Sequence, residues 1–245
     1  MTAALPRFWR HRVASCGGVV HEVDGLAVCL TGVPDDPFNP TLVEHTPSNP
    51  AVALLAAAEH YRPTGLSLGV DLEPGTHAEV RTAVEGGGFR MVESRPGMAL
   101  PIAELRSVPA PPGVQIGVVD DPGLLAAAAE ADAASFGADV ALARAFLPDT
   151  LVGDPWQRVY VAVVEGKVVG AGESALADGV LGVFGIATVP SYRRRGIAAA
   201  LTSRLIENRA RDADLAVLQS SRLGYGVYER LGFRAMSTWE VWVEG

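Results

Sequence analysis

Apolar and polar residues alternate along the chain in segments that predict strands and helices in turn. In the first half, two apolar runs flank Asp24 and Gly25, which predicts a β-hairpin over residues 18–32. The other elements predicted for this half are a helix that begins at Pro50 after the turn and cap residues Thr46, Ser48 and Asn49, a strand over 66–74, a helix over 75–89 and a strand over 90–100.

The second half shows the same mixture of periods. A hairpin is predicted over 158–176, and a continuous apolar run over 179–189 indicates a strand buried on both faces. Apolar residues then recur at spacings of four from Ile197, so one face of a helix from Gly196 to about Arg211 is expected to pack on the sheet. The remaining predicted elements are a strand over 114–119, helices over 122–136 and 139–147, a strand over 215–221, a helix over 224–232 and a strand over 233–244.

The two halves resemble each other in outline. The stretch VEGGGFRMVESRPGMAL in the first half and YERLGFRAMSTWEVWVE in the second share a Gly-Phe-Arg that leads into a final strand. Such an echo is typical of an internal duplication. Between the halves, three prolines in SVPAPPGV indicate a stiff linker. We therefore predict two domains, 1–106 and 113–245, joined by a linker over 107–112.

Composition narrows the possible functions. The 245 residues carry a net charge of −8 and are 49 % hydrophobic, which suits a packed acidic protein and argues against general binding to nucleic acid or an anionic membrane. Two cysteines fit a reduced compartment, and the Cys and His residues form no four-ligand metal pattern. The N-terminus has no signal-peptide pattern, and Glu130 and Asp132 interrupt the Ala-rich stretch 123–135. We expect a cytoplasmic protein with no metal, no membrane partner and no nucleic-acid partner.

One short stretch concentrates positive charge in this acidic chain. Arg193, Arg194 and Arg195 stand directly before Gly196, between a buried strand and an amphipathic helix. The first N–H groups of a helix lack intrahelical partners, and the helix dipole is positive there, so a diphosphate suits the position. The bland alternative is a solvated basic turn. No Gly-Lys-Ser/Thr follows, and only one glycine of a dinucleotide fingerprint is present, which argues against those two phosphate motifs.

The sequence RRRGIA, residues 193–198, resembles the Arg/Gln-x-x-Gly-x-Gly/Ala motif of the GNAT acetyltransferase superfamily. The preceding strand VFGIATVP and the later VYERLGF match that family in order and spacing. The resemblance covers about 113–245 well and 1–105 faintly, as in tandem-domain members. It implies an α/β (α+β) fold of two GNAT-like domains, each a mixed, mostly antiparallel sheet flanked by helices, with a splayed central strand pair in the C-terminal domain.

The resemblance also implies a binding site for acetyl-CoA. The diphosphate is expected on the amides of 194–199, and the pantetheine arm along the preceding strand. The residues implied are Ile186, Ala187, Thr188, Arg193, Arg194, Arg195, Gly196, Ile197, Ala198 and Ala199. Ala198 replaces the last glycine of the motif, a change that the family tolerates. The matching junction of the first half, VEHTPSNPAVALL, has neither arginine nor glycine, so that half is expected to be structural or to shape the substrate site.

Acetyl transfer from a thioester to an amine needs a donor for the thioester oxygen, an acid for the thiolate and a route for the amine proton. A backbone N–H near Ala187 or Thr188 can serve as the donor. Tyr228 is the candidate acid, because it lies five residues before Phe233, where the family often places one. The alternative is an ordinary core tyrosine.

The base is less defined. Glu173 on the predicted third strand is the leading candidate, and a solvated edge glutamate is the alternative. Other candidates are Glu130, Asp132 and an acceptor that binds already neutral. All five histidines fall in the first half, so His21 or His45 could take part only if the domains face each other. Cys16 and Cys29 are expected to be small buried hydrophobes, and Trp156 lies in a loop that could wall an acceptor pocket.

These observations predict an acetyl-CoA-dependent N-acetyltransferase that acts on a primary amine of a small molecule or an amino-acid-like acceptor. A non-catalytic acyl-CoA-binding or regulatory module is the alternative. A third reading, in which the arginines contact nucleic acid, is disfavoured by the acidic composition. The sequence leaves both a monomer and a homodimer open.

Overall fold

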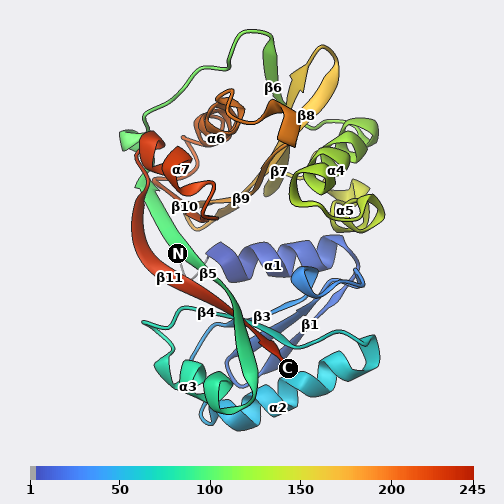
Figure 1. The fold of residues 1–245 in the computed structure, drawn as a ribbon, viewed down its shortest axis with the longest axis vertical. Helices are drawn as coiled ribbons and strands as arrows, with labels where there is room; N and C mark the ends of the chain where they lie inside the picture. Colours follow the sequence, from blue (N-terminus) through green and yellow to red (C-terminus); the bar gives the residue numbers. More distant parts are fainter. Residues whose placement is uncertain (1–3) are drawn as a thin grey trace.

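A single mixed sheet runs the length of the molecule in the computed structural model, which describes residues 4–245 (Figure 1). Within these residues the sheet has eleven strands, in the order β1-β2-β3-β4-β11-β5-β10-β9-β8-β7-β6. The strands are β1 (Val19–Val23), β2 (Leu26–Leu30), β3 (Pro40–Val43), β4 (Gly69–Leu72), β5 (Phe89–Pro101), β6 (Val114–Val118), β7 (Gln157–Val164), β8 (Lys167–Ala177), β9 (Val180–Thr188), β10 (Leu215–Gln219) and β11 (Arg234–Glu244).

Helices cover both faces of this sheet. They are α1 (Ala4–Ser15), α2 (Pro50–Tyr61), α3 (Ala78–Gly86), α4 (Pro122–Phe136), α5 (Val140–Phe146), α6 (Ile197–Glu207) and α7 (Tyr225–Leu231), with short 3-10 turns at Asp36–Phe38, Arg62–Thr64, Ile102–Glu104, Asp149–Leu151 and Pro190–Tyr192. In the second half, α6 and α7 lie on one face, and α4 and α5 lie on the other (Figure 1). None of the helices in 4–245 is long and apolar enough to cross a membrane.

Local sequence signals explain most of these boundaries. The hairpin of β1 and β2 turns at Asp24 and Gly25, which both have positive φ, as a tight two-residue turn requires. Asp121 caps α4 by accepting from the Leu124 N–H at 2.9 Å, and Gly137 ends that helix in the left-handed conformation. The predicted mixed α/β fold is confirmed.

Three details differ from the sequence expectation. Helix α6 ends at Glu207 rather than near Arg211, because Asn208 to Asp212 fold into turns closed by short-range backbone bonds. Strand β3 is too short to stand out as a periodic segment. Helix α1 was not predicted from the sequence, and two of its arginines pair with acids elsewhere in the chain: the exposed Arg7 with Asp178, and Arg10 with Glu44.

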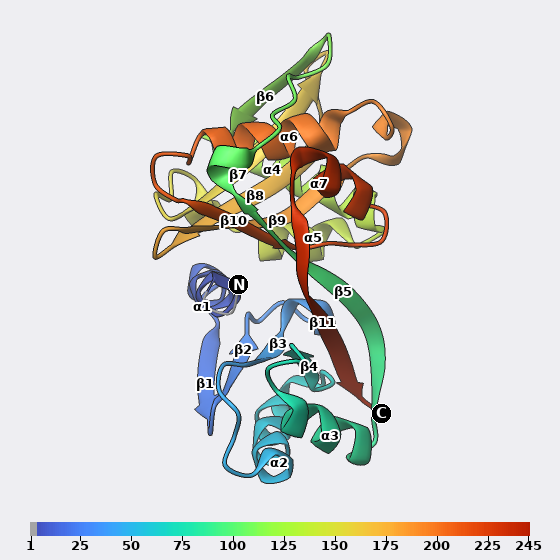
Figure 2. The same ribbon diagram turned by 90° about the vertical axis from the view of Figure 1, so that its left-hand side faces the viewer.

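The last strand of each half is shared with the other half (Figure 2). The C-terminal part of β5 pairs with β10, from Gly97↔Gln219 to Pro101↔Leu215. The C-terminal part of β11 pairs with β4, from Glu240↔Leu72 to Val243↔Gly69. On their other edges, β5 and β11 pair with each other along most of their length, from Arg234↔Ala99 to Glu244↔Phe89. The division into domains 1–106 and 113–245 stays a prediction. In the structure, each half contributes its last strand to the part of the sheet formed by the other half.

The predicted linker does not hang free but follows α6 toward its N-terminus. The Ser107 hydroxyl donates to Glu207, and the Val108 N–H donates to Ser203 Oγ at 3.1 Å. Pro111 reaches the first turn, where its Cγ lies 3.6 Å from the point that a Cβ on Gly196 would occupy. The linker therefore borders the junction between β9 and α6.

Helix α1 lies between the two halves (Figures 1 and 2). On one side it packs with Ala27, Cys29 and Leu42 of the first half. On the other side, Phe8 stacks on Phe184 of β9, with ring centroids 3.8 Å apart. An element of the first half thus reaches the sheet of the second.

Candidate functional site

Strands β9 and β10 separate after three residue pairs. Their parallel pairing runs only from Leu215↔Val180 to Val217↔Gly182. Beyond that point β10 stays on β5, whereas β9 continues as far as Thr188 on β8 alone. The predicted splayed strand pair is present, and among residues 4–245 no strand pairs with one edge of β9 over 183–188.

The free edge of β9 offers backbone groups to the gap. The Val189 N–H donates to Val169 O at 2.9 Å, toward β8. Because successive residues of a strand point their backbone groups to opposite sides, Ala187 faces β8 while Ile186 and Thr188 face the gap. Gly185 has φ +56 and lies at a register shift between β8 and β9, so it marks a bulge just below these groups.

The junction between β9 and α6 forms a cradle of backbone amides. Gly196 caps α6 in the left-handed conformation at φ +81, and Arg194 is also left-handed at φ +60. The first helical bond runs from the Ala200 N–H to Gly196 O at 3.1 Å. Within the described chain, the N–H groups of 194–199 donate to no backbone carbonyl. A set of converging N–H groups with no side chain at Gly196 fits an anion such as a diphosphate.

The three arginines do different things. Arg193 braces the cradle, because its Nε donates to Thr188 O at 3.1 Å and its Nη2 donates to Ser135 O of α4 at 2.7 Å. Arg195 lies over the Tyr192 ring and donates to Ser191 O. Arg194 is exposed and makes no side-chain hydrogen bond within 4–245. Arg194 is therefore the guanidinium best placed to meet an incoming anion.

Tyr228 lies on α7 at the end of β10. Its ring packs edge-on against Phe233, with centroids 5.8 Å apart, and lies against Gly224. Burial raises the pKa of Tyr228 to about 12, which keeps the phenol protonated at neutral pH. The side chain belongs to the core under α6 and α7, so the structure is compatible with both roles considered for it.

Glu173 is a buried, paired carboxylate rather than a solvated edge residue. Its Oε2 accepts from the Arg12 guanidinium and from Gln157 Nε2 at 2.7 Å. Its Oε1 faces β9, where it lies 3.3 Å from the position of a Cβ on Gly185. That Glu173 acts as the base stays a prediction. The structure adds that Glu173 is paired with the buried Arg12 guanidinium.

Arg12 is a functional candidate that sequence reasoning missed. It is fully buried, its guanidinium lies 4.4 Å from the Phe146 ring centroid, and it also donates to Phe146 O. The only signal in the sequence is the polar face of a short helix rich in arginine, which does not reveal a partner 161 residues away. Tertiary structure alone brings Arg12 to Glu173.

The other candidate bases fall into two groups. Glu130 pairs with Arg144 on the surface, and His21 stacks on His60 of α2 in the first half. Asp132, by contrast, is half-buried in α4 near Glu173, and burial together with that carboxylate raises its pKa to about 7. Cys29 is buried as expected, and Cys16 is half-buried with a pKa raised by desolvation.

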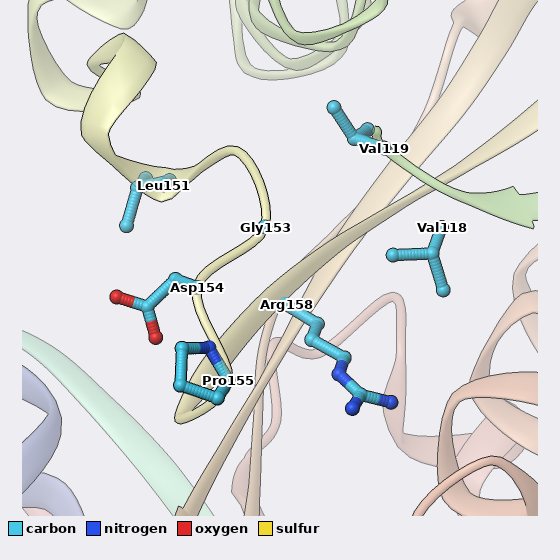
Figure 3. A pocket seen from close by; sticks show the side chains of 7 residues that line it. All are labelled: Val118, Val119, Leu151, Gly153, Asp154, Pro155 and Arg158. Carbon is cyan, nitrogen blue, oxygen red and sulfur yellow. The ribbon is translucent and has the colours of Figure 1, made fainter. Parts of the chain in front are cut away.

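A cavity of about 240 Å³ lies at the other end of these strands (Figure 3). Its lining residues are Val118, Val119, Leu151, Gly153, Asp154, Pro155 and Arg158. It adjoins Trp156, whose ring packs at a tilt against His11 of α1 with centroids 4.6 Å apart. Since Gln157 pairs with Ala175 whereas Thr188 pairs with Gly170, this cavity is separated from the amide cradle along β8. It is not part of the candidate site.

Comparison with known proteins places the cradle in a family. Residues 155–235 match the model for the acetyltransferase (GNAT) domain, a span that includes β9, the cradle and Tyr228. The search of curated protein sequences gave no match.

Solved structures resemble nearly the whole chain. A GCN5-related N-acetyltransferase from Kribbella flavida superposes with a TM-score of 0.74 at 21% identity, covering 97% of this chain and 94% of that one. A GNAT-family acetyltransferase from Novosphingobium aromaticivorans gives 0.60 at 18%, covering 94% and 95%. A tandem GNAT protein from the clavulanic acid biosynthesis pathway gives 0.61 at 17%, covering 90% and 78%. These likenesses establish the fold.

Proposed function

We propose that this chain, which belongs to the GNAT acetyltransferase superfamily, transfers an acetyl group from acetyl-CoA to a primary amine of a small molecule or an amino-acid-like acceptor. The observation that carries the proposal is the amide cradle at Gly196 directly above the free edge of β9. Both parts are needed, since one holds an anion and the other holds an extended chain with amide groups.

In this proposal the N–H groups of 194–199 bind the diphosphate, with Arg194 adding a charge-assisted contact. Ile186 and Thr188 pair with the amides of the pantetheine arm, much as an added strand would. The arm then runs down the gap toward the bulge at Gly185. An N–H on this edge can donate to the thioester oxygen as negative charge develops there.

Tyr228 supplies the proton for the departing thiolate. A phenol with a pKa of about 12 stays protonated at neutral pH, and its proton moves only to a strong base formed close by. Glu173 acts on the acceptor. Its Oε1 is directed at the bulge at Gly185, where it can hold the acceptor ammonium. The Arg12 ion pair fixes the orientation of that carboxylate.

A thiol-release screen with acetyl-CoA and a panel of amines, amino acids and aminoglycosides tests the proposal. We expect at least one amine to be acetylated, and calorimetry to show 1:1 binding of acetyl-CoA. Binding without transfer to any amine would favour the alternative, a non-catalytic acyl-CoA module. Absence of binding would contradict both.

The Tyr228→Phe variant then tests the acid. Removing a positioned acid should lower kcat by about 100-fold, with the Kd for acetyl-CoA unchanged. Tyr225→Phe, in the same helix and packed at the edge of the same core, is the matched control and should keep full activity. Equal rates for Tyr228→Phe and the wild type would show that Tyr228 is a core residue only.

A further inference from the structure

One carboxylate lies on the sheet-facing row of α4. Asp132 follows Leu125, Ala128 and Ala129 at spacings of seven, four and three residues, so it continues the same helix face. Those three residues are buried against Val159, Val161 and Ala171 of β7 and β8. No side chain in 4–245 forms a hydrogen bond with Asp132, although a half-buried carboxylate normally has a partner.

Two contacts connect the surroundings of Asp132 to the free edge of β9. Ser135, one helical turn further along α4, accepts a hydrogen bond from Arg193, and Arg193 also donates to Thr188 O. Glu173, the carboxylate that acts on Asp132 electrostatically, has its free oxygen beside Gly185. Ser135 on the same helix and the neighbouring Glu173 thus connect Asp132 to the two ends of the stretch 185–188, where the acyl group is expected.

We propose that Asp132 accepts the proton of the acceptor ammonium, and that Glu173 and Arg12 are positioning residues that set its charge and hold the amine beside it. This inference rests on the proposed function, which does not say where the proton of the amine goes, and it names that acceptor. It also gives the first half a part in the reaction, because Arg12 belongs to α1.

The step balances as follows. The ammonium nitrogen loses one proton to the Asp132 carboxylate. The resulting neutral nitrogen forms a bond to the acyl carbon, and the carbon–sulfur bond breaks. Tyr228 protonates the sulfur and regains the second proton of the nitrogen, and Asp132 releases its proton to solvent. The net products are an amide, a free thiol and one proton.

The surroundings suit this task. Desolvation and the neighbouring Glu173 raise the pKa of Asp132 to about 7, whereas Arg12 acts in the opposite direction. A base titrating near neutral pH combines an ionised form with a useful proton affinity. Cys16, directly after α1, is a further titratable group near the cluster, and burial raises the pKa of its thiol, so it stays uncharged.

The central experiment is the pH dependence of kcat/KM. The wild type should show an acidic limb near pH 7, and Asp132→Asn should lower kcat by about 100-fold and remove that limb. Glu130→Gln, in the same helix but on the surface, is the matched control and should behave as wild type. An Asp132→Asn enzyme with normal rate and profile would overturn the proposal.

Two further variants shift the limb in opposite directions. Glu173→Gln removes a negative neighbour and should move it down by about 1 pH unit, whereas Arg12→Gln removes a positive one and should move it up. A purely structural role would not give shifts of opposite sign. If Arg12→Gln fails to fold, Glu173→Gln alone still distinguishes the two carboxylates. Complete loss of the acidic limb of kcat/KM in Glu173→Gln would mean that Glu173, and not Asp132, is the base.

A measurement without acceptor separates this inference from the proposed function. Carboxyl carbon NMR of the whole protein should show Asp132 titrating near pH 7. Because a raised folded-state pKa costs stability as pH rises from the unfolded value toward it, Asp132→Asn should gain more in Tm at pH 8 than at pH 5. Titration near pH 4 would overturn the proposal even in an active enzyme. Failure of the wild type to acetylate any amine would reject the function, and the proton route with it.

Discussion

Both halves contain a strand, a helix and a second strand parallel to the first, in the same order. They differ at the junction where the first strand leads into the helix. In the second half the order is β9, α6, β10, and in the first it is β3, α2, β4. At the start of α6, Gly196 offers a left-handed backbone without a side-chain cap. At the start of α2, Asn49 is extended and its side chain accepts from the Val52 N–H at 3.2 Å.

The chemistry of the first junction leaves no place for a phosphate. Asn49 satisfies one of the first amides of α2, and Pro50 removes another. Ser48 donates to the Asp24 carboxylate through its N–H and its hydroxyl, so a carboxylate already occupies the anion position at this junction. Strands β3 and β4 also pair over three residues, from Pro40↔Gly69 to Leu42↔Asp71, but β3 ends at Val43 and has no long unpaired continuation like that of β9. In the proposed function, the same topology would therefore bind a diphosphate only where the helix start is left uncapped.

The largest effect should come from Gly196→Glu. A carboxylate would project into the cradle, and the side chain would strain a residue at φ +81, although its Cβ would meet only Pro111 Cγ, in ordinary contact at 3.6 Å. Loss of one or two charge-assisted hydrogen bonds, each about 1.5–3 kcal/mol, corresponds to a Kd for acetyl-CoA raised by about 100-fold. Isothermal titration calorimetry measures the change.

Gly65→Glu is the control, because Gly65 has a similar φ of +73, open space and a place in the first half. It should lose stability in the same way and keep the wild-type Kd. An equal loss of affinity in both variants would mean that strain, rather than the cradle, is responsible.

Arg194→Glu should have the next largest effect. An exposed charge contact contributes up to about 1 kcal/mol, and reversing it adds repulsion, so the Kd should rise by about 10-fold. The loss should shrink as salt concentration increases, because exposed charges are screened. Arg62→Glu, which reverses an exposed arginine of the first half, should leave the Kd unchanged. A salt-independent loss at Arg194 would contradict an electrostatic role.

The sequence predicts those parts of the fold whose signals are local. The hairpin at Asp24 and Gly25, the cap at Asn49 and the helix start at Gly196 each follow from residues next to one another. The uncapped amides at 194–199 could be anticipated for the same reason. The separate tasks of the three arginines could not, since they depend on Ser135, Ser191 and the turn between β9 and α6.

Features that depend on contacts between distant segments could not be predicted from the sequence. Helix α1 is held in position by the pairing of Arg12 with Glu173, which no spacing rule reveals. The exchange of β5 and β11 likewise follows from strand pairing between the halves. Asp132 is an intermediate case. Its spacing from Leu125 is visible in the sequence, but the Ala-rich stretch hides which face of α4 meets the sheet.

The smallest effect should come from the first junction. Asn49→Ala removes a side-chain cap and should destabilise the protein by about 1 kcal/mol, which lowers Tm by about 2–4 °C in a chain of this size. The Kd for acetyl-CoA should not change, because α2 takes no part in binding. Differential scanning fluorimetry with and without acetyl-CoA measures both quantities. If Asn49→Ala instead created a second binding site, the cap would be what separates the two halves, and the uncapped amides alone would be enough to hold the diphosphate.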